Sequence, residues 1–481
     1  MITSSDIIRG RSFGNPLSIF GIPARLSNTR NPRTLDYSGK RFSGGVITTG
    51  GGVAGRPLQQ VGEYYKELLT EVGQNLTASE IREILKVVSN PEYKDRLISF
   101  AGGIPDPVTF PINELRDGFN RFLLSQYADS AFQYGETAGI APLRDHLAQM
   151  ESRQQGRNFT RENILITTGS QQALDLIFTG FLERGTPLMA GVPIYLGCEQ
   201  AAAKNGGYSL YLQTDDNGLI PSQVEDCVKF FRANETRRSI PTLLYVVPNF
   251  DNPTGKTIPL DRRQELLSLA QRHHFLIIED DPYGALRYRG ENIPSLKSMD
   301  DTGNVILCKS FSKTAMPGLR VGYVVADPVI IAKLELIKQG ADLQSSSFSQ
   351  YALFEYLRNN DIWEHVRNDI VPLYSSKMMT MLNALKQHFT GKWTSQSVWT
   401  KPDGGMFLWM TFPNIPGFDC RALVPELLEK TQVAWVSGGA FLGEPNTARF
   451  NFTKETPEKI KEGVRRIAKF VEDKCEELSE K

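Results

Sequence analysis

The stretch VILCKSFSKTAMPGLR, residues 305–320, decides how the rest of the sequence is interpreted. Its first four residues are apolar on both faces, which is typical of a strand buried in a mostly parallel sheet. Similar apolar runs alternate with helical stretches and cover residues 164–166, 187–189, 243–247, 276–278 and 321–325. This alternation predicts an α/β three-layer sandwich with a mostly parallel central sheet, in which ligands bind at the carboxyl ends of the strands.

The sequence predicts four segments around this sheet. Residues 1–76 form a basic extension, rich in Gly and Pro, with one helix. The apolar residues of that helix recur at helical spacing: Leu58, Val61, Tyr65, Leu68 and Val72. Residues 77–115 begin with a second helix, for which Ser79 is a candidate N-cap, and belong to a small domain. Residues 116–344 form the large domain, and residues 345–481 complete the small α+β domain with a charged helix over 457–474.

The composition limits the kinds of partner that the protein can have. The 481 residues include 54 Lys and Arg and 54 Asp and Glu, so no overall field attracts nucleic acid or a membrane surface. No apolar run reaches the ~20 residues that a membrane span needs. Five scattered cysteines without a CxxC pair fit a reducing compartment, and we expect a soluble, cytoplasmic protein without a metal site.

The N-terminal segment leaves an alternative open. Residues 1–56 carry eight Lys and Arg residues but only Asp6 and Asp36 as acids. Such segments direct some proteins to mitochondria or another organelle, and they also occur as arms draped over the protein surface.

Two polar segments that follow predicted strands are candidate ligand loops. Residues 168–174 pass through a glycine into a helix start, where free backbone N–H groups bind an anion. An ordinary helix cap by Ser170 explains this segment equally well. Residues 249–255 form a turn by their Asn-Pro and Thr-Gly pairs, and the Asn252 amide is a candidate donor to a ligand oxygen.

Two further segments carry charge at the ends of buried strands. Residues 277–283 read IIEDDPY, and acids in this position need a partner because an unpaired buried carboxylate is costly. Helix capping, magnesium binding and pairing with a protonated pyridine nitrogen each supply one. Residues 309–320 combine two hydroxyls, Lys313 and Arg320 after a strand, and this spacing favours a ligand-binding lysine over a solvated one.

Together these segments resemble the class I/II aminotransferase family, whose members have the aspartate-aminotransferase type of fold and use pyridoxal 5′-phosphate (PLP). The Asn-Pro-Thr-Gly turn, the Glu-Asp-Asp-Pro-Tyr strand end and the Ser-Phe-Ser-Lys…Pro-Gly-Leu-Arg segment occur in the family's order. Further matches lie at residues 100–105, 134–139, 404–407 and 449–452. The resemblance runs from about residue 78 to about residue 475 and is strongest to the aromatic, kynurenine and 2-aminoadipate branch.

The resemblance implies a cofactor site. Lys313 would carry PLP and act as the general base and acid on the substrate Cα proton. Asp280 would pair with the pyridine nitrogen, while Tyr283 and Asn252 contact the phenolic oxygen. The other implied contacts are a ring stacked by Tyr195, a phosphate held by Ser170, Gln171, Ser310, Ser312 and Arg320, and Tyr134 reaching that phosphate from the partner subunit of a homodimer.

The resemblance also implies how substrates bind. Arg449 would hold the α-carboxylate of the amino acid or 2-oxo acid, near Asn252 and the backbone at Gly103. The Ser-Glu-Ile-Arg segment at 79–82 would place Arg82 against a distal carboxylate, although a solvated arginine on an amphipathic helix explains that segment too. The expected reaction moves an amino group from an aromatic or 2-aminoadipate-like amino acid to a 2-oxo acid, with 2-oxoglutarate as the expected acceptor.

Two other functions fit parts of the sequence. A C–S lyase or decarboxylase would keep the cofactor and change the reaction, but Arg449 argues against it. A transcription regulator of this fold would need a DNA-binding domain in the N-terminal extension, where residues 57–77 contain no recognition-helix pattern. One departure from the family concerns the stretch AGVPIY at 190–195, which lacks the usual acidic residue and puts the fine position of Tyr195 in question.

Overall fold

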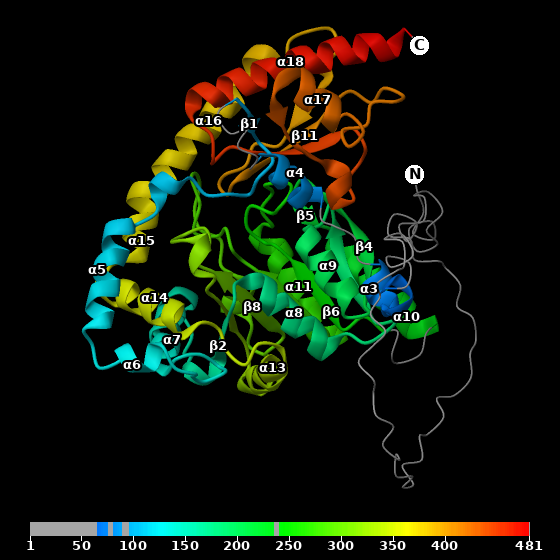
Figure 1. Ribbon diagram of the computed structural model, residues 1–481. Coiled ribbons are helices and arrows are strands. Elements are labelled where there is room, and N and C mark those ends of the chain that lie inside the picture. Colours follow the sequence, from blue (N-terminus) through cyan, green and yellow to red (C-terminus); the bar gives the residue numbers. More distant parts are fainter. Residues whose placement is uncertain (1–64, 76–79, 89–95, 235–239, 481) are drawn as a thin grey trace, which may run out of the picture. The chain divides into compact units, whose positions relative to one another are not determined.

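A computed structural model describes residues 65–75, 80–88, 96–234 and 240–480 (Figure 1). The chain divides into two compact units, residues 1–78 and residues 79–481. In the described part of the first unit, residues 65–68 and α3 (Glu71–Asn75) are helical. The predicted helix through Val72 is therefore interrupted at residues 69–70, while its start and Ser79 lie outside the described residues.

The second unit is built on an eight-stranded sheet. Its strand order is β2-β9-β8-β7-β6-β3-β4-β5, and the pairs among β8, β7, β6, β3 and β4 are parallel. The strands are β2 (Ile164–Thr167), β3 (Pro187–Val192), β4 (Tyr208–Asp215), β5 (Gly218–Leu219), β6 (Leu243–Val246), β7 (Leu276–Asp280), β8 (Val305–Ser310) and β9 (Gly322–Val325). The six predicted strands are all present, and β4 and β5 are additional.

Helices cover both faces of this sheet, because alternate strand residues point to opposite sides. Ile278 and Ile306 pack into one apolar core with α8 (Ser170–Phe181), α9 (Leu196–Lys204) and α13 (Pro328–Ala341). Their neighbours Ile277 and Val305 pack on the other face against α10 (Pro221–Asn234), α11 (Leu260–His273) and α12 (Leu296–Met299). On the same face, a third core holds Leu307 with α5 (Ile112–Leu123), α7 (Ala141–Gln155) and α14 (Ser347–Asn359). The predicted three-layer sandwich is confirmed.

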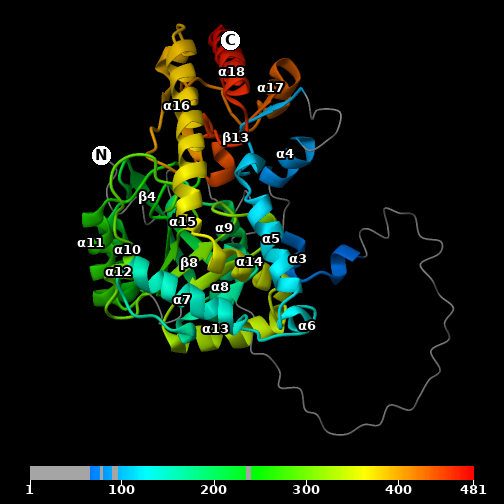
Figure 2. The same ribbon diagram turned by 90° about the vertical axis from the view of Figure 1, so that its left-hand side faces the viewer.

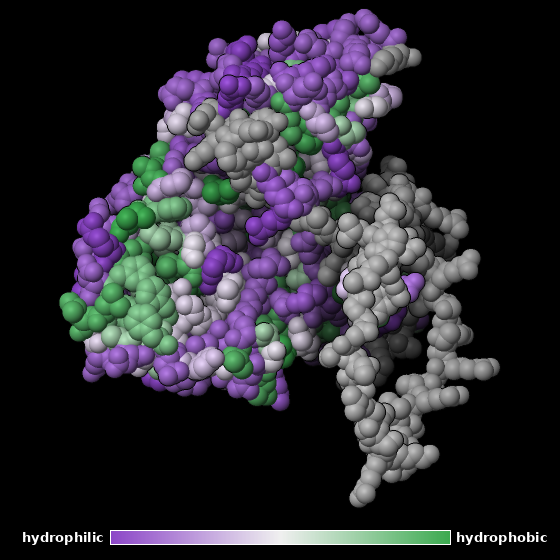
Figure 3. All heavy atoms as spheres, viewed as in Figure 1, coloured by the Kyte–Doolittle hydropathy of each residue, from purple (hydrophilic) through white to green (hydrophobic). Residues whose placement is uncertain are grey.

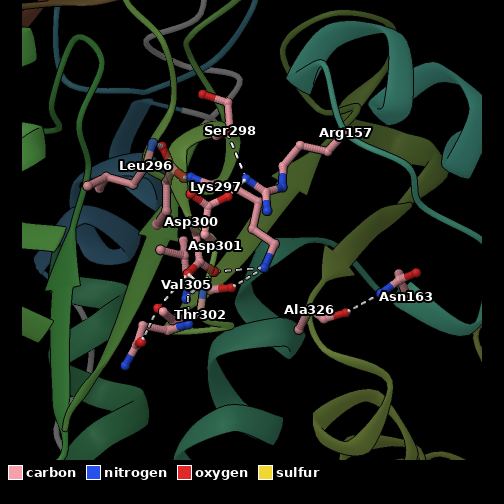
Figure 4. A network of polar contacts seen from close by, with 12 residues as sticks. Arg157, Asn163, Leu296, Lys297, Ser298, Asp300, Asp301, Thr302, Val305 and Ala326 are labelled. Carbon is pink, nitrogen blue, oxygen red and sulfur yellow. Dashed lines mark hydrogen bonds and ion pairs between the residues drawn. The ribbon is translucent and has the colours of Figure 1, made fainter. Parts of the chain in front are cut away.

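A polar network fastens α12 to the sheet (Figure 4). Lys297 donates to Asp300 (3.2 Å) and to the carbonyl of Val305 at the start of β8 (2.8 Å). Arg157, which follows α7, donates to the Ser298 carbonyl and to Asp301. These contacts hold α12 against the start of β8, and the first residues of α12 also donate to Glu279 on β7.

The smaller part of the second unit contains an antiparallel sheet of β10 (Val398–Trp399), β11 (Phe407–Thr411), β14 (Thr447–Asn451) and β13 (Val436–Ser437). A parallel pair, β1 (Ile98–Ser99) with β12 (Val433–Ala434), brings an N-terminal segment beside it. Two long helices, α16 (Val371–His388) and α18 (Pro457–Ser479), lie side by side over its apolar core (Figure 2). The predicted α+β character is confirmed, and the predicted domain limits stay predictions.

The remaining helices are α4 (Glu80–Val88), α6 (Ala128–Ala131), α15 (Ile362–His365) with a π-helical turn at Val366–Ile370, and α17 (Val424–Thr431). Among the described α-helices, six have a proline in their first two positions, where the missing N–H costs no helical hydrogen bond: α7, α10, α13, α16, α17 and α18. Among the described residues, no helix is both long enough and apolar enough to cross a membrane.

Candidate active site

The polar segments predicted as ligand loops converge at the carboxyl ends of the central strands. Asp280 ends β7, Ser310 ends β8, Gly169 follows β2 and Tyr195 follows β3. Arg449 comes from β14 of the smaller sheet, and its side chain donates to Asn252 in the loop after β6. The site therefore lies where the eight-stranded and the four-stranded sheets of the second unit meet.

The three consecutive acids after Ile278 have three different environments. Glu279 accepts the backbone N–H groups of Leu296 and Lys297 at the start of α12, so helix capping explains this residue. Asp281 accepts from Asn249 (3.0 Å) and from the backbone of Gly284 (3.0 Å). Only Asp280 points into the site.

Asp280 is buried with one oxygen occupied and one free. Its Oδ2 accepts from the Tyr245 hydroxyl at 2.8 Å. Its Oδ1 is buried and has no hydrogen-bond partner among the described residues, which calls for a donor. Burial raises the pKa of Asp280 to about 7, with Tyr245 opposing the shift. A protonated pyridine nitrogen would supply the missing N–H and the missing positive charge.

Lys313 extends toward the segment after β1. Its Nζ donates to the Gly103 carbonyl at 2.8 Å. Burial, followed by the positive charges of Arg449 and Arg320, lowers the pKa of Lys313 to about 8. A lysine with a pKa near neutrality is available as a neutral nucleophile and base.

Donors for an anion gather around Gly169. This glycine occupies the N-cap position of α8 with φ +79°, and no side chain caps the helix, so the capping role considered for Ser170 is wrong. Ser312 contacts Ser310 (2.9 Å) and Arg320 (3.4 Å), and Arg320 also donates to the Thr168 carbonyl. A helix N-terminus, hydroxyls and an exposed guanidinium together could hold a phosphate, and we call this group the phosphate cradle.

Arg449 is almost fully buried, with 2% of its surface exposed. It donates to Asn252 Oδ1 (2.8 Å) and to the Ala101 carbonyl (2.7 Å), and its Cζ lies 4.3 Å from the ring centre of Phe407 and 4.9 Å from that of Phe441. Its Nε is buried without a partner among the described residues. Burial lowers the pKa of Arg449 to about 10. An arriving carboxylate would satisfy this cation.

Two tyrosines border the same space. Asn252 Nδ2 donates to the Tyr283 hydroxyl at 3.4 Å. The Tyr195 hydroxyl donates to Gln171 Oε1 at 3.2 Å, which ties α9 to the first turn of α8. Burial raises the pKa of Tyr195 to about 12, while Arg449 and Arg82 act in the opposite direction.

Two predicted site residues form no hydrogen bond or ion pair with this cluster among the described residues. Tyr134 is 80% exposed and contacts none of the residues above within its own chain in the described contacts. Arg82 is exposed on α4, whose Glu80 contacts Ser437 on β13 and forms an ion pair with Arg421 (2.6 Å).

Sequence reasoning missed three residues that contact the cluster. Tyr245 supports Asp280, and its polar hydroxyl within the apolar run LLYVV was the available signal. Phe407 and Phe441 enclose Arg449. Phe407 belongs to the GGMF stretch that carried part of the resemblance, whereas the sequence around Phe441 offers no signal.

The sequence matches the family described as aminotransferase class I and II over residues 73–467, and the chain belongs to this family. It is a PLP-dependent aminotransferase. The free Asp280 oxygen, the phosphate cradle and Lys313 fit this cofactor, which, when bound, supplies a protonated ring that accepts the electrons left behind at the substrate Cα.

Known relatives match this chain over nearly their whole length, two of them in solved structures. Aromatic-amino-acid aminotransferase 1 of Thermococcus litoralis is 36% identical over 412 residues, which cover 85% of this chain and 95% of that protein. The structure of a kynurenine aminotransferase of Pyrococcus horikoshii in complex with PMP is 36% identical, with a TM-score of 0.79, covering 86% of this chain and 99% of its own. LysN, an α-aminoadipate aminotransferase of Thermus thermophilus, solved with N-(5′-phosphopyridoxyl)-L-leucine, is 34% identical, with a TM-score of 0.75 over 86% and 99% of the two chains.

Proposed function

We propose that this aminotransferase moves the amino group of an aromatic or 2-aminoadipate-like amino acid to a 2-oxo acid, with 2-oxoglutarate as the acceptor. Arg449 carries this proposal, because it is buried, forms no ion pair among the described residues and acts through its charge on Lys313, and its planar fork matches a substrate α-carboxylate bidentately. The names of the relatives support both substrate classes. The aromatic rings of Phe407 and Phe441 add apolar surface at the same place.

Each residue then has a defined task. Asp280 would keep the cofactor ring protonated, Asn252 and Tyr283 would donate to its phenolic oxygen, and Tyr195 would stack on the ring. Ser170, Gln171, Ser310, Ser312 and Arg320 would hold its phosphate. Lys313, with its lowered pKa, would accept the proton from the substrate Cα as general base and hold it as general acid for the second half of the transfer. Arg449 fixes the carboxylate so that the Cα–H bond faces Lys313.

The substrate class is tested by single-turnover reactions of the cofactor-loaded enzyme with a panel of amino acids. The absorption change of the bound cofactor reports amino-group uptake. We expect aromatic amino acids, 2-aminoadipate and glutamate to react fastest. Faster reaction with alanine or basic amino acids, or release of ammonia or CO₂, would contradict the proposal.

We further propose that Arg82 binds the distal carboxylate of glutamate and 2-oxoglutarate. Support comes from α4, which packs on β13, the strand paired with Arg449, and from the influence of the Arg82 charge on Tyr195. An aromatic substrate would displace this helix and use apolar contacts instead.

The Arg82 proposal is tested with Arg82→Ala. An arginine–carboxylate hydrogen bond contributes ~1.5–3 kcal/mol, so the glutamate reaction should weaken roughly ten- to a hundredfold and the aromatic reaction should stay nearly intact. Lys86→Ala removes another exposed charge from the same helix and should change neither. Equal losses for both substrates in Arg82→Ala would show a structural role only.

We infer that the enzyme works as a homodimer. Apolar side chains gather on one face over α5, α6 and α14 (Figure 3). The exposed members of this apolar face are Ile112, Leu123, Leu124, Phe132, Tyr134 and Phe348. Large exposed apolar patches mark association sites. We propose that a second copy binds this face and that its Tyr134 contacts the phosphate cradle of the neighbouring subunit. All five cysteines are buried free thiols, which fits the cytoplasmic location we propose.

A further inference from the structure

Arg263 is a buried arginine on α11 that the reaction described above does not use. Its side chain is fully buried, with 0% of its surface exposed. All five N–H donors of its guanidinium are engaged. They reach the carbonyls of Ile258 (2.8 Å), Pro248 (2.9 Å), Pro294 (3.0 Å) and Ile293 (3.5 Å), and Oδ1 of Asn249 (2.7 Å).

None of these acceptors is a carboxylate. A buried cation held by neutral groups costs desolvation free energy, and burial lowers the pKa of Arg263 accordingly. The adjacent Arg262 differs, because it is partly exposed and forms a salt bridge with Asp215 (2.6 Å). Only a planar guanidinium can present five donors in a fixed fork, so Lys could not replace Arg263.

Two of the five acceptors of Arg263 lie at the two ends of one loop. Pro248 and Ile258 enclose residues 249–257, and the N–H of Ile258 also donates to the Pro248 carbonyl (2.9 Å). Asn252 sits in this loop and contacts Arg449 and Tyr283. The guanidinium therefore fixes the base of the loop from which Asn252 projects.

A relay through Asn249 reaches the neighbouring turn. Asn249 accepts from Arg263 and donates through Nδ2 to Asp281 (3.0 Å). Asp281 also accepts the N–H of Gly284 (3.0 Å), which closes the turn that carries Tyr283. One guanidinium thus connects the segments after β6 and β7 and, through Pro294, the segment before α12.

We propose that Arg263 is a positioning residue that sets Asn252 against Tyr283 and thereby aims Arg449 at the substrate carboxylate. Arg263 touches neither the cofactor site nor the substrate site directly. The inference rests on the roles proposed above for Asn252, Tyr283 and Arg449.

The test uses Arg263→Lys in the cofactor-loaded enzyme. The pH midpoint of the absorption change of bound PLP is one readout, because donors to the phenolic oxygen stabilise its charged form. We expect the midpoint to rise by about 1 pH unit and KM for the amino acid to rise about tenfold. Arg262→Lys is the matched control on the same helix and should change neither value.

A second variant keeps the test decisive if Arg263→Lys does not fold. Asn249→Ala removes only the relay to Asp281 and should move the midpoint in the same direction by a smaller amount. If either folded variant lowers the melting temperature but leaves both the midpoint and KM unchanged, Arg263 serves stability alone and the proposal is overturned.

Asn252→Ala separates this inference from the proposed function. If Asn252→Ala moves the midpoint and Arg263→Lys does not, the positioning role falls while the proposed function stands. If Asn252→Ala leaves the midpoint unmoved, the proposed role of Asn252 falls and the inference falls with it.

Discussion

At the scale of single residues, we propose that Lys313 carries the chemistry. Its amine lies beside the Gly103 carbonyl and has a lowered pKa, so Lys313→Ala should lower turnover by at least about 10³-fold. Borohydride should no longer fix cofactor to the protein, as measured by mass spectrometry. Lys204→Ala, which removes an exposed ion pair with Asp175, is the control and should behave as wild type. Cofactor still fixed by borohydride in Lys313→Ala would refute the assignment.

Asp280 predicts a pH dependence of stability in the cofactor-free enzyme. Its pKa is raised from 3.8 to about 7, so the folded protein keeps a proton that the unfolded chain has already released. Stability therefore falls as the pH rises between these values. The free energy of unfolding, measured with urea, should fall between pH 5 and pH 7.5. This fall should be on the order of 2 kcal/mol larger in wild type than in Asp280→Asn.

Comparing wild type with Asp280→Asn separates the contribution of Asp280 to the pH dependence from that of other buried acids. Burial also raises the pKa of Glu279 to about 7 and that of Asp251 to about 6, and both residues are present in wild type and variant. The same pH slope in both proteins would show that Asp280 is not the titrating group.

Sequence reasoning identified Asp280 and not its support. The acid at the end of an apolar run is visible because it breaks the pattern. Tyr245 lies inside the apolar run of the neighbouring strand β6. Its hydroxyl reaches Asp280 only because β6 pairs with β7 in a parallel register. That register is a tertiary property, so the sequence alone could not supply the contact.

At the scale of elements, the turn from β2 into α8 shapes the phosphate cradle. A Cβ added at Gly169 would lie 2.6 Å from Arg320 Nη2, and the backbone there has φ +79°. Gly169→Ala should therefore displace Arg320 and weaken PLP binding about tenfold or more, measured by equilibrium dialysis. Gly156→Ala is the matched control, since its φ is also positive (+64°) but its Cβ would meet nothing within 4 Å. Equal affinities of the two variants for PLP would contradict the proposal that the phosphate cradle binds the cofactor.

Strands were predictable where burial makes both faces apolar. β6, β7 and β8 are such strands, and their apolar runs predicted them. β4 reads YSLYLQTD and is only partly buried, because it lies near the edge of the sheet. Its mixed pattern gives little signal, and the two-residue β5 that pairs with it gives none.

At the scale of the whole molecule, the apolar face over α5, α6 and α14 predicts a dimer. Leu124 is 90% exposed and Phe132 is 70% exposed. The double variant Leu124→Glu/Phe132→Glu should shift light scattering from twice 53.8 kDa to the monomer and remove most activity. Val398→Glu, at an exposed position on β10, should leave the mass unchanged. A fully active wild-type monomer at assay concentration would contradict the dimer.

The pairing of β1 with β12 has a consequence for protein synthesis. Ala101, just after β1, accepts its hydrogen bond from Arg449, 348 positions later in the chain. Ribosomes extend a chain by about 5–20 residues per second, so this segment leaves the exit tunnel roughly 20–70 s before its partner exists. The residues that contact Arg449 can therefore come together only late, when translation is almost complete. A nascent chain halted before Val433 contains Lys313 and the phosphate cradle but lacks Arg449, the residue proposed to hold the substrate α-carboxylate.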